Sequence, residues 1–113
     1  MKNTLSLKKS SDFQRILKRG TWCSRDYLSV YLTKNSTNLN YLGIAVGKKG
    51  LTSVERNRIK RLIRESYKNI EKNIKVGYNI IVLWKSKNSF EMASYDRIES
   101  DLVKCFEKCK ILI

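Results

Sequence analysis

Apolar residues spaced three and four apart predict a long helix in the middle of the chain. The positions that recur in this way are Ile59, Leu62, Ile63, Tyr67 and Ile70. At about 100° per residue they form one stripe that faces a core. The run from Thr52 to Glu55 fits a capping box, in which the threonine hydroxyl and the glutamate carboxylate satisfy free backbone N–H groups. The helix is therefore predicted to begin just after Thr52 and to end near Glu71.

Two further helices are predicted towards the ends of the chain. The run from Ser11 to Gln14 fits a second capping box and Gly20 supplies a stop, so a short helix is expected over about residues 11–19. From about residue 94 to residue 110, apolar residues again recur at helical spacing: Ile98, Leu102, Cys105, Phe106 and Cys109. This stripe is typical of a helix that packs on a sheet.

The remaining patterned segments are β-like. Residues 22–33 are rich in Tyr, Val and Leu and end at a polar, turn-forming run, and a second strand is expected over residues 41–46. The almost uninterrupted apolar run 79–84 predicts a strand buried on both faces, with a parallel neighbour. The predicted order is thus helix, two or three strands, helix, strand and helix, which gives an α+β sandwich with helices laid on a small sheet. The chain has no proline and shows no repeat, so residues 1–113 are expected to form one domain.

The charge of the chain points to a polyanionic partner. Twenty-four Lys and Arg against ten Asp and Glu give a net charge of +14, and residues 48–68 alone hold eight basic and two acidic residues. Such concentration favours nucleic acid over a membrane surface, whereas an even spread would suit a role in solubility. The longest apolar run is too short to cross a membrane and the first residues lack the apolar stretch of a signal peptide. A cytoplasmic location is expected.

The basic residues of the central helix mostly avoid its apolar stripe. We call them, with the asparagine among them, the basic ridge: Arg56, Asn57, Arg58, Lys60, Arg61, Arg64 and Lys68. Three of these cations stand at successive steps of four, where like charges repel by a few tenths of a kcal/mol unless an anion relieves them. A merely solvated face is the alternative, but acidic residues would then more often be interleaved. Arginine also offers planar forks for phosphate or base contacts.

Candidate catalytic chemistry is sparse. The chain has no histidine, its acidic residues are scattered, and its three cysteines lack the spacing of a zinc site, so buried thiols are expected. Five aromatic residues of the N-terminal half could stack on bases or support the core: Phe13, Trp22, Tyr27, Tyr31 and Tyr41. We predict core or fold support for Trp22 and Tyr41 and leave both roles open for Phe13 and Tyr31. The residues alone indicate a basic RNA-binding α+β domain that is not itself the catalyst.

Several runs of the sequence resemble the motifs of a known protein family. The run from Gly43 to Lys49, a six-residue gap and the run from Arg56 to Tyr67 closely resemble the RNR motif of the bacterial ribonuclease P protein component. Upstream, the lysines after Leu7 and the run from Asp12 to Gln14 resemble that family's opening. The resemblance implies a two-layer α/β sandwich in the order α-β-β-β-α-β-α, with a left-handed β-α-β crossover that the usual handedness rule argues against.

The resemblance also implies a function. Proteins of this family join a large catalytic RNA that removes the 5′ leader from precursor tRNA, and the RNA hydrolyses the phosphodiester with Mg²⁺ held mainly by RNA and substrate. The expected partners are therefore the catalytic RNA and the leader, with no membrane and no DNA. Catalytic residues are not expected in the protein, nor is a metal bound directly by it.

Carried over by position, the residues of the basic ridge would contact the catalytic RNA. The leader-binding cleft would include Phe13, Leu17, Tyr31, Lys48 and Lys49, and Lys85 and Lys87 would add further RNA contacts. Leu17 stands where the cleft often carries a second aromatic, so contact there would be apolar and base preference weaker.

Two other functions fit the composition. A ribosomal or general RNA-binding protein could dock on RNA with the same ridge, but it has no need for a single-strand cleft. An independent metal-dependent nuclease would require clustered carboxylates and would cleave without an RNA partner.

Overall fold

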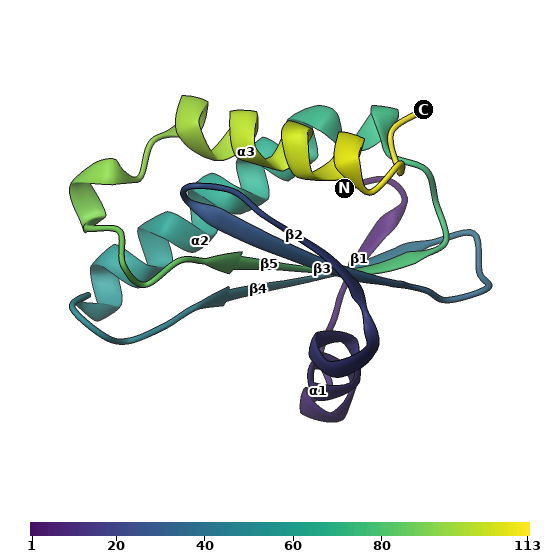
Figure 1. Cartoon of the computed structure of the whole chain (residues 1–113), viewed down its shortest axis with the longest axis horizontal. Coiled ribbons are helices and arrows are strands. Elements are labelled where there is room, and N and C mark those ends of the chain that lie inside the picture. Colours follow the sequence, from purple (N-terminus) through teal and green to yellow (C-terminus); the bar gives the residue numbers. More distant parts are fainter.

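The computed structural model describes residues 1–113 and is built around one five-stranded sheet (Figure 1). The strands are β1 (Thr4–Ser6), β2 (Thr21–Ser24), β3 (Leu28–Lys34), β4 (Asn40–Val46) and β5 (Tyr78–Trp84). They lie in the order β1-β4-β5-β3-β2. Strand β4 is parallel to both β1 and β5, whereas β3 is antiparallel to β5 and β2. The expected parallel neighbour of the apolar strand is thus β4.

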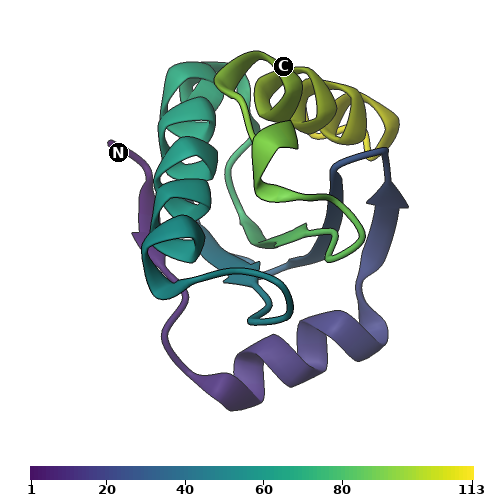
Figure 2. The same ribbon diagram turned by 90° about the vertical axis from the view of Figure 1, so that its left-hand side faces the viewer.

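Three helices cover the two faces of this sheet. Helices α2 (Ser53–Ile70) and α3 (Tyr95–Lys108) lie side by side on one face, and α1 (Ser10–Arg19) crosses the other face alone (Figure 2). Two short 3₁₀ turns, η1 (Glu71–Asn73) and η2 (Phe90–Met92), follow α2 and β5. The predicted α+β class is confirmed.

The strands of the first half of the chain were only partly predicted. The β-like segment over residues 22–33 is a hairpin of two strands, β2 and β3, which turns at residues 25–27 without glycine or proline. With β4 it gives three strands between α1 and α2, the larger of the two numbers that the sequence left open and the number that the resemblance implied. Strand β1 was not predicted, because its three residues carry too short a pattern and its partner β4 lies about 36 residues away in the chain. The observed order is therefore β-α-β-β-β-α-β-α.

The connection from β4 through α2 to β5 is left-handed, as the resemblance implied. In Figure 2 the ends of these two strands point towards the viewer, β4 lies to the left of β5, and α2 runs back above them. The chain therefore turns in the opposite sense to the usual β-α-β unit. This places the basic helix over β4 and towards the β1 edge of the sheet.

Strand alternation decides which residues enter the core. Leu28, Val30 and Leu32 of β3 belong to the main apolar cluster beneath α2 and α3, together with the alternate residues of β5. Ser29 and Tyr31 therefore point to the opposite face, towards α1. The same alternation in the other strands places one set of side chains in the buried core under α2 and α3. The other set lies on the opposite face, which α1 covers only in part.

Of the two predicted capping boxes, the one at the start of α2 is present and the one at the start of α1 is not. The Thr52 Oγ1 accepts a hydrogen bond from the Glu55 N–H (3.1 Å), and the Glu55 carboxylate accepts one from the Thr52 N–H (2.9 Å), which confirms the capping box. No such box begins α1, whose N-cap is Lys9 without a side-chain bond. Gly20 follows the last residue of α1 as predicted and donates its N–H to the Ile16 carbonyl at 2.8 Å; glycine fits there because an added Cβ would lie 2.5 Å from that oxygen.

Strand β1 is attached to the end of α2 by buried polar groups. The Glu71 carboxylate accepts hydrogen bonds from the Lys2 N–H (2.9 Å) and the Asn3 N–H (3.3 Å), and the hydroxyls of Thr4 and Tyr67 are 2.8 Å apart. Burial opposes ionisation of Glu71, but bonds from Thr4, Lys2 and Asn3 outweigh it, so the pKa of Glu71 is lowered from 4.5.

We expect Glu71→Gln to destabilise the protein by about 1.5–3 kcal/mol at pH 7, the usual contribution of hydrogen bonds to a charged group. Because the pKa of Glu71 is lower in the folded state, this contribution is complete above about pH 5 and is lost as the pH falls through the folded value. Urea unfolding of both proteins between pH 7 and pH 3 measures it. Glu107→Gln, at an exposed position on α3, is the control, and a difference that stays constant with pH would contradict the assignment.

Candidate RNA interface

The cations of the basic ridge are free of acidic partners. The only ion pair in the structure joins Asp12 and Arg15 on α1. Asn57, Arg58, Arg61, Arg64 and Lys68 are exposed, and Arg56 and Lys60 are half-buried. The Arg56 guanidinium donates to the Ser53 hydroxyl at 3.0 Å, so one ridge cation is partly held within the first turn. The others present unneutralised charge to solvent.

The ridge residues do not share one face of α2. At about 100° per residue, Arg56 and Arg58 point in nearly opposite directions, roughly 160° apart. Lys60 and Arg64 lie on the flank towards β4, where both line a cavity of about 200 Å³. The helix therefore offers cations over a wide arc around its exposed side, and one edge of this arc meets the sheet.

The second face of the sheet carries aromatic and small side chains in ordered rows. Register aligns Gly43, Ile81, Tyr31 and Trp22 across β4, β5, β3 and β2. The next row, towards the ends of β4 and β5, consists of Ala45, Leu83, Ser29 and Ser24. This second row is small or aliphatic, and Figure 1 shows α1, which lies on this face, away from the end of the sheet where the row lies. The two rows form the floor of an open cleft beside α1.

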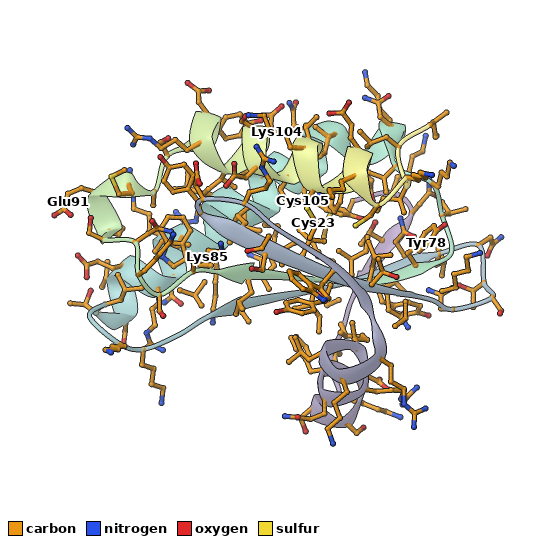
Figure 3. The ribbon with its side chains drawn as sticks, viewed as in Figure 1. Cys23, Tyr78, Lys85, Glu91, Lys104 and Cys105 are labelled. Carbon is orange, nitrogen blue, oxygen red and sulfur yellow. The ribbon has the colours of Figure 1, made fainter.

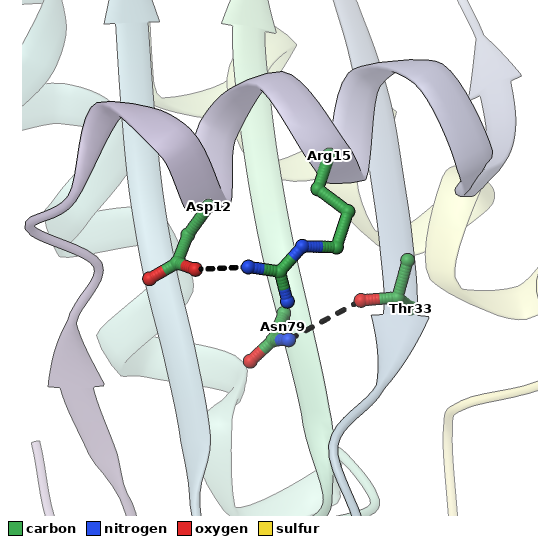
Figure 4. Close-up of polar contacts among 4 residues, drawn as sticks. All are labelled: Asp12, Arg15, Thr33 and Asn79. Carbon is green, nitrogen blue, oxygen red and sulfur yellow. Dashed lines mark hydrogen bonds and ion pairs between the residues drawn. The ribbon is translucent and has the colours of Figure 1, made fainter.

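Helix α1 forms one wall of this cleft. The ring of Phe13 lies directly on Gly43, where an added Cβ would be 2.3 Å from the Phe13 Cζ atom. Leu17, one turn further along α1, is 40% exposed. The ion pair of Asp12 and Arg15 (2.8 Å) lies on the other flank of the helix, which leaves the flank of Phe13 and Leu17 for the cleft (Figure 4).

The far side of α1 has different chemistry. There the Asn79 side-chain amide donates to the Thr33 hydroxyl at 3.2 Å, below Arg15 in Figure 4. Tyr41, in register with Asn79, is half-buried on this same face rather than in the core under α2 and α3. Helix α1 thus divides the face into a polar half and the cleft.

The predicted lysines gather at the carboxyl ends of two neighbouring strands. Lys48 and Lys49 follow β4, and Lys85 and Lys87 follow β5. Because β4 and β5 are parallel and Val46 pairs with Trp84, the segments after them leave the sheet at the same edge. Lys85 and Lys87 line a shallow hollow of about 470 Å³ with Gly47. All four lysines therefore follow strands that end at the same edge of the sheet, the edge at which the cleft is open.

One prediction about the aromatic residues is wrong. Trp22 is 63% exposed on β2, whereas Trp84 is buried at 2% and stacks on Tyr27 with ring centroids 6.3 Å apart. The alternation of β2 explains this, because Cys23 takes the inward position. The sequence could have shown that Trp22 faces outward only if the four residues of β2 had been recognised as a strand distinct from β3.

The cysteines pack as predicted. Cys23 and Cys105 are buried, with the Cys105 thiol donating to the Cys23 carbonyl at 3.7 Å, and Cys109 is half-buried (Figure 3). Burial, above all, raises the pKa of the Cys105 thiol. No three acidic or cysteine side chains converge to hold a metal ion. None of the helices is both long enough and apolar enough to span a membrane.

Fold and site together define an α+β protein with two surfaces suited to RNA, a cation-rich helix and an aromatic cleft. The family model described as ribonuclease P matches residues 1–110. The ribonuclease P protein component of Clostridium botulinum (strain Loch Maree / Type A3) is 40% identical over 93% of this chain and 94% of its own length. That of Clostridioides difficile is 38% identical over 89% and 90%.

Solved structures agree with the sequence matches. A structure of the Staphylococcus aureus RNase P protein superposes with a TM-score of 0.83 at 33% identity, covering 96% of this chain and 97% of that one. The RNase P protein from Thermotoga maritima gives 0.79 at 29% identity, over 88% and 93%. The chain belongs to the ribonuclease P family of protein components.

Proposed function

We propose that this chain, as the protein subunit of ribonuclease P, binds the catalytic RNA with the basic ridge and the 5′ leader of precursor tRNA with the cleft. Family membership gives it a part in the 5′ maturation of tRNA, together with an RNA subunit. Which residues contact which RNA is inferred from their placement and chemistry. The ridge is cationic, as a structured RNA requires, whereas the cleft is aromatic and apolar, as a single strand with exposed bases requires.

The ridge suits a structured RNA with closely spaced phosphates. Six cations between Arg56 and Lys68, none in an ion pair, would release counterions on binding, which makes affinity strongly dependent on salt. Asn57 adds an uncharged donor and acceptor among them. Since the cations cover a wide arc, contacts with more than one RNA segment are expected.

The cleft suits single-stranded RNA. Its aromatic rings, Phe13 and Tyr31, are half-buried, so each presents part of a ring on which a base could stack. Leu17 offers apolar contact at the wall. The lysines at the open end would attract the leader backbone.

The observation that carries the proposal is the junction of these two surfaces. Lys60 and Arg64 of the ridge line the same cavity as Phe13 and Gly43 of the cleft. One continuous surface can therefore hold the catalytic RNA and pass a strand into the cleft. A protein that only docks on ribosomal RNA has no use for this arrangement.

The proposal assigns chemistry to the RNA. The carboxylates of the chain do not fit a metal site, since no group of three donors converges. Mg²⁺ is therefore held by the RNA and the substrate. The protein's part is to raise local cation density, orient the leader and hold it near the catalytic RNA.

Reconstitution tests the proposed function. Purified protein alone should not cleave precursor tRNA, whereas adding it to the cognate catalytic RNA at low Mg²⁺ should restore 5′ processing, because its positive charge offsets repulsion between the two RNAs. Single-turnover cleavage with and without protein measures this. A rate at low Mg²⁺ that equals that of the RNA alone would refute the proposal.

The cleft has its own prediction. Phe13→Ala should weaken binding of leader-bearing precursor by about 1–3 kcal/mol, the usual contribution of one stacked base. Binding of mature tRNA, which lacks the leader, should be unchanged. Titration of the reconstituted holoenzyme with both RNAs measures the difference. Equal losses for the two RNAs would show that Phe13 supports the fold and does not bind the leader.

A further inference from the structure

Trp22 is exposed in a way that the proposed sites leave unexplained. Its side chain is 63% accessible, more than that of any other aromatic residue. The two ring pairs of the structure, Tyr27 with Trp84 and Tyr67 with Phe106, do not involve it. It lies on β2, the outermost strand of the sheet on the side opposite β1. A large, rigid and uncovered ring at this position is suited to a ligand.

The register of the sheet places Trp22 on the same face as the cleft. Trp22 pairs directly with Tyr31. The hydroxyls of Ser24 and Ser29, two positions further along, are 3.1 Å apart on this face. Between them, Cys23 belongs to the apolar cluster on the opposite side. Trp22 therefore continues the row that begins at Gly43.

The charges around Trp22 favour RNA over an apolar protein surface. Lys18 and Arg19 end α1 just before β2, and Arg25 follows β2. All three are exposed and none is in an ion pair. A flat indole flanked by free cations matches a single-stranded polyanion with flat bases, whereas a protein partner would leave these cations desolvated and unpaired.

We propose that Trp22 is a further base-stacking position of the cleft, which binds a leader nucleotide beyond those held at Phe13 and Tyr31. This inference rests on the proposed function. The row from β4 to β2 crosses three interstrand spacings, about 14 Å, so Trp22 reaches nucleotides that Phe13 cannot. The β4 end of the row adjoins the basic ridge, so a leader that emerges beside the catalytic RNA reaches Trp22 last.

The two tryptophans allow a direct test. In a Trp84→Phe background, Trp22 is the only tryptophan, and its fluorescence in the reconstituted holoenzyme reports its own contacts. Precursor tRNAs with leaders lengthened one nucleotide at a time should quench this emission only beyond a threshold length. Emission that is unchanged with every leader would overturn the proposal.

Affinity gives a second measurement that does not depend on the Trp84 variant. Trp22→Ala should lower holoenzyme affinity about five- to hundredfold for leaders above the threshold and leave shorter leaders unaffected. Trp22→Phe should keep most of the affinity, because a ring remains. Tyr95→Ala, which removes a 36% exposed ring from α3, is the matched control and should have no effect at any length.

The outcomes separate this proposal from the one on which it rests. If Phe13→Ala weakens leader binding and Trp22→Ala does not at any length, only the role of Trp22 is refuted. If neither variant distinguishes precursor from mature tRNA, the cleft assignment itself is wrong. If Trp22 emission shifts with protein concentration in the absence of RNA, Trp22 instead contacts a second copy of the chain, and the stacking role is overturned.

Discussion

Replacing Arg61 and Arg64 together with glutamine is expected to weaken binding of the catalytic RNA on the order of a hundredfold. Both side chains are exposed and without an acidic partner, so their removal costs few contacts within the protein. A charge-assisted contact contributes about 1.5 kcal/mol or more, and two such losses correspond to roughly that factor. The fold should be unaffected, since the apolar stripe of α2 is untouched.

Salt dependence makes this prediction specific. Each lost phosphate contact reduces the log–log slope of affinity against salt by about 0.9, so the double variant should be less steep by about 1.8. Filter binding or fluorescence titration across a salt series measures the slope. Lys104→Gln with Lys108→Gln is the matched control, because it removes the same charge from exposed positions of α3.

Two results would contradict the role of the ridge. Equal losses in the α3 control would show that only net charge matters. An unchanged slope in the ridge variant would show that Arg61 and Arg64 do not meet phosphate. Since half of the ten acidic residues lie between residues 91 and 107, the α3 side of the molecule is the less favourable one for a polyanion, and the control should behave as the wild type does.

Replacing Gly43 with alanine is expected to damage the cleft by displacing Phe13, the aromatic residue of its wall. The new Cβ would lie 2.3 Å from Cζ, 2.9 Å from Cε1 and 3.0 Å from Cε2 of the Phe13 ring, so the whole ring must move. Overpacking of this kind typically costs about 1–3 kcal/mol. Urea unfolding should show that loss, and affinity for leader-bearing precursor should fall because the ring no longer lies along the cleft.

A double variant tests whether the contact with Phe13 is the cause. Phe13→Ala in the Gly43→Ala background should recover most of the lost stability, because the side chain that the methyl group meets is gone. The effects of the two substitutions on stability should therefore be strongly non-additive. Leader affinity should stay low, because the stacking ring is still missing. Additive effects on stability would place the damage elsewhere in β4.

The parts of the structure that sequence could predict depend on residues close together in the chain. The stripe of α2 and the capping box at Thr52 require only the periodicity of a helix and a spacing of three residues, and both were predicted. The ridge was identified for the same reason. Strand β1 was missed, and the division of residues 22–33 into two strands was left open, because three- and four-residue strands are too short for alternation to distinguish them.

The composition of the cleft depended on contacts between distant segments. Helical spacing alone cannot tell that Phe13 lies on Gly43, thirty residues away, or that Trp22 faces outward beside Tyr31. The crossover was expected from family resemblance, since general handedness statistics predict the opposite.

The amino-acid sequence by itself determined the amphipathic helices, the excess of positive charge and its concentration on α2, because each is a property of local spacing and side-chain type. Only the tertiary structure decided that this charge adjoins an aromatic cleft. Pairing of β4 with β5 brings Lys48 and Lys85 to one edge, and pairing of β2 with β3 places Trp22 beside Tyr31. The physical reason is that the register between strands is fixed by the burial of apolar side chains on the core face of the sheet. This register in turn decides which side chains become neighbours on the open face.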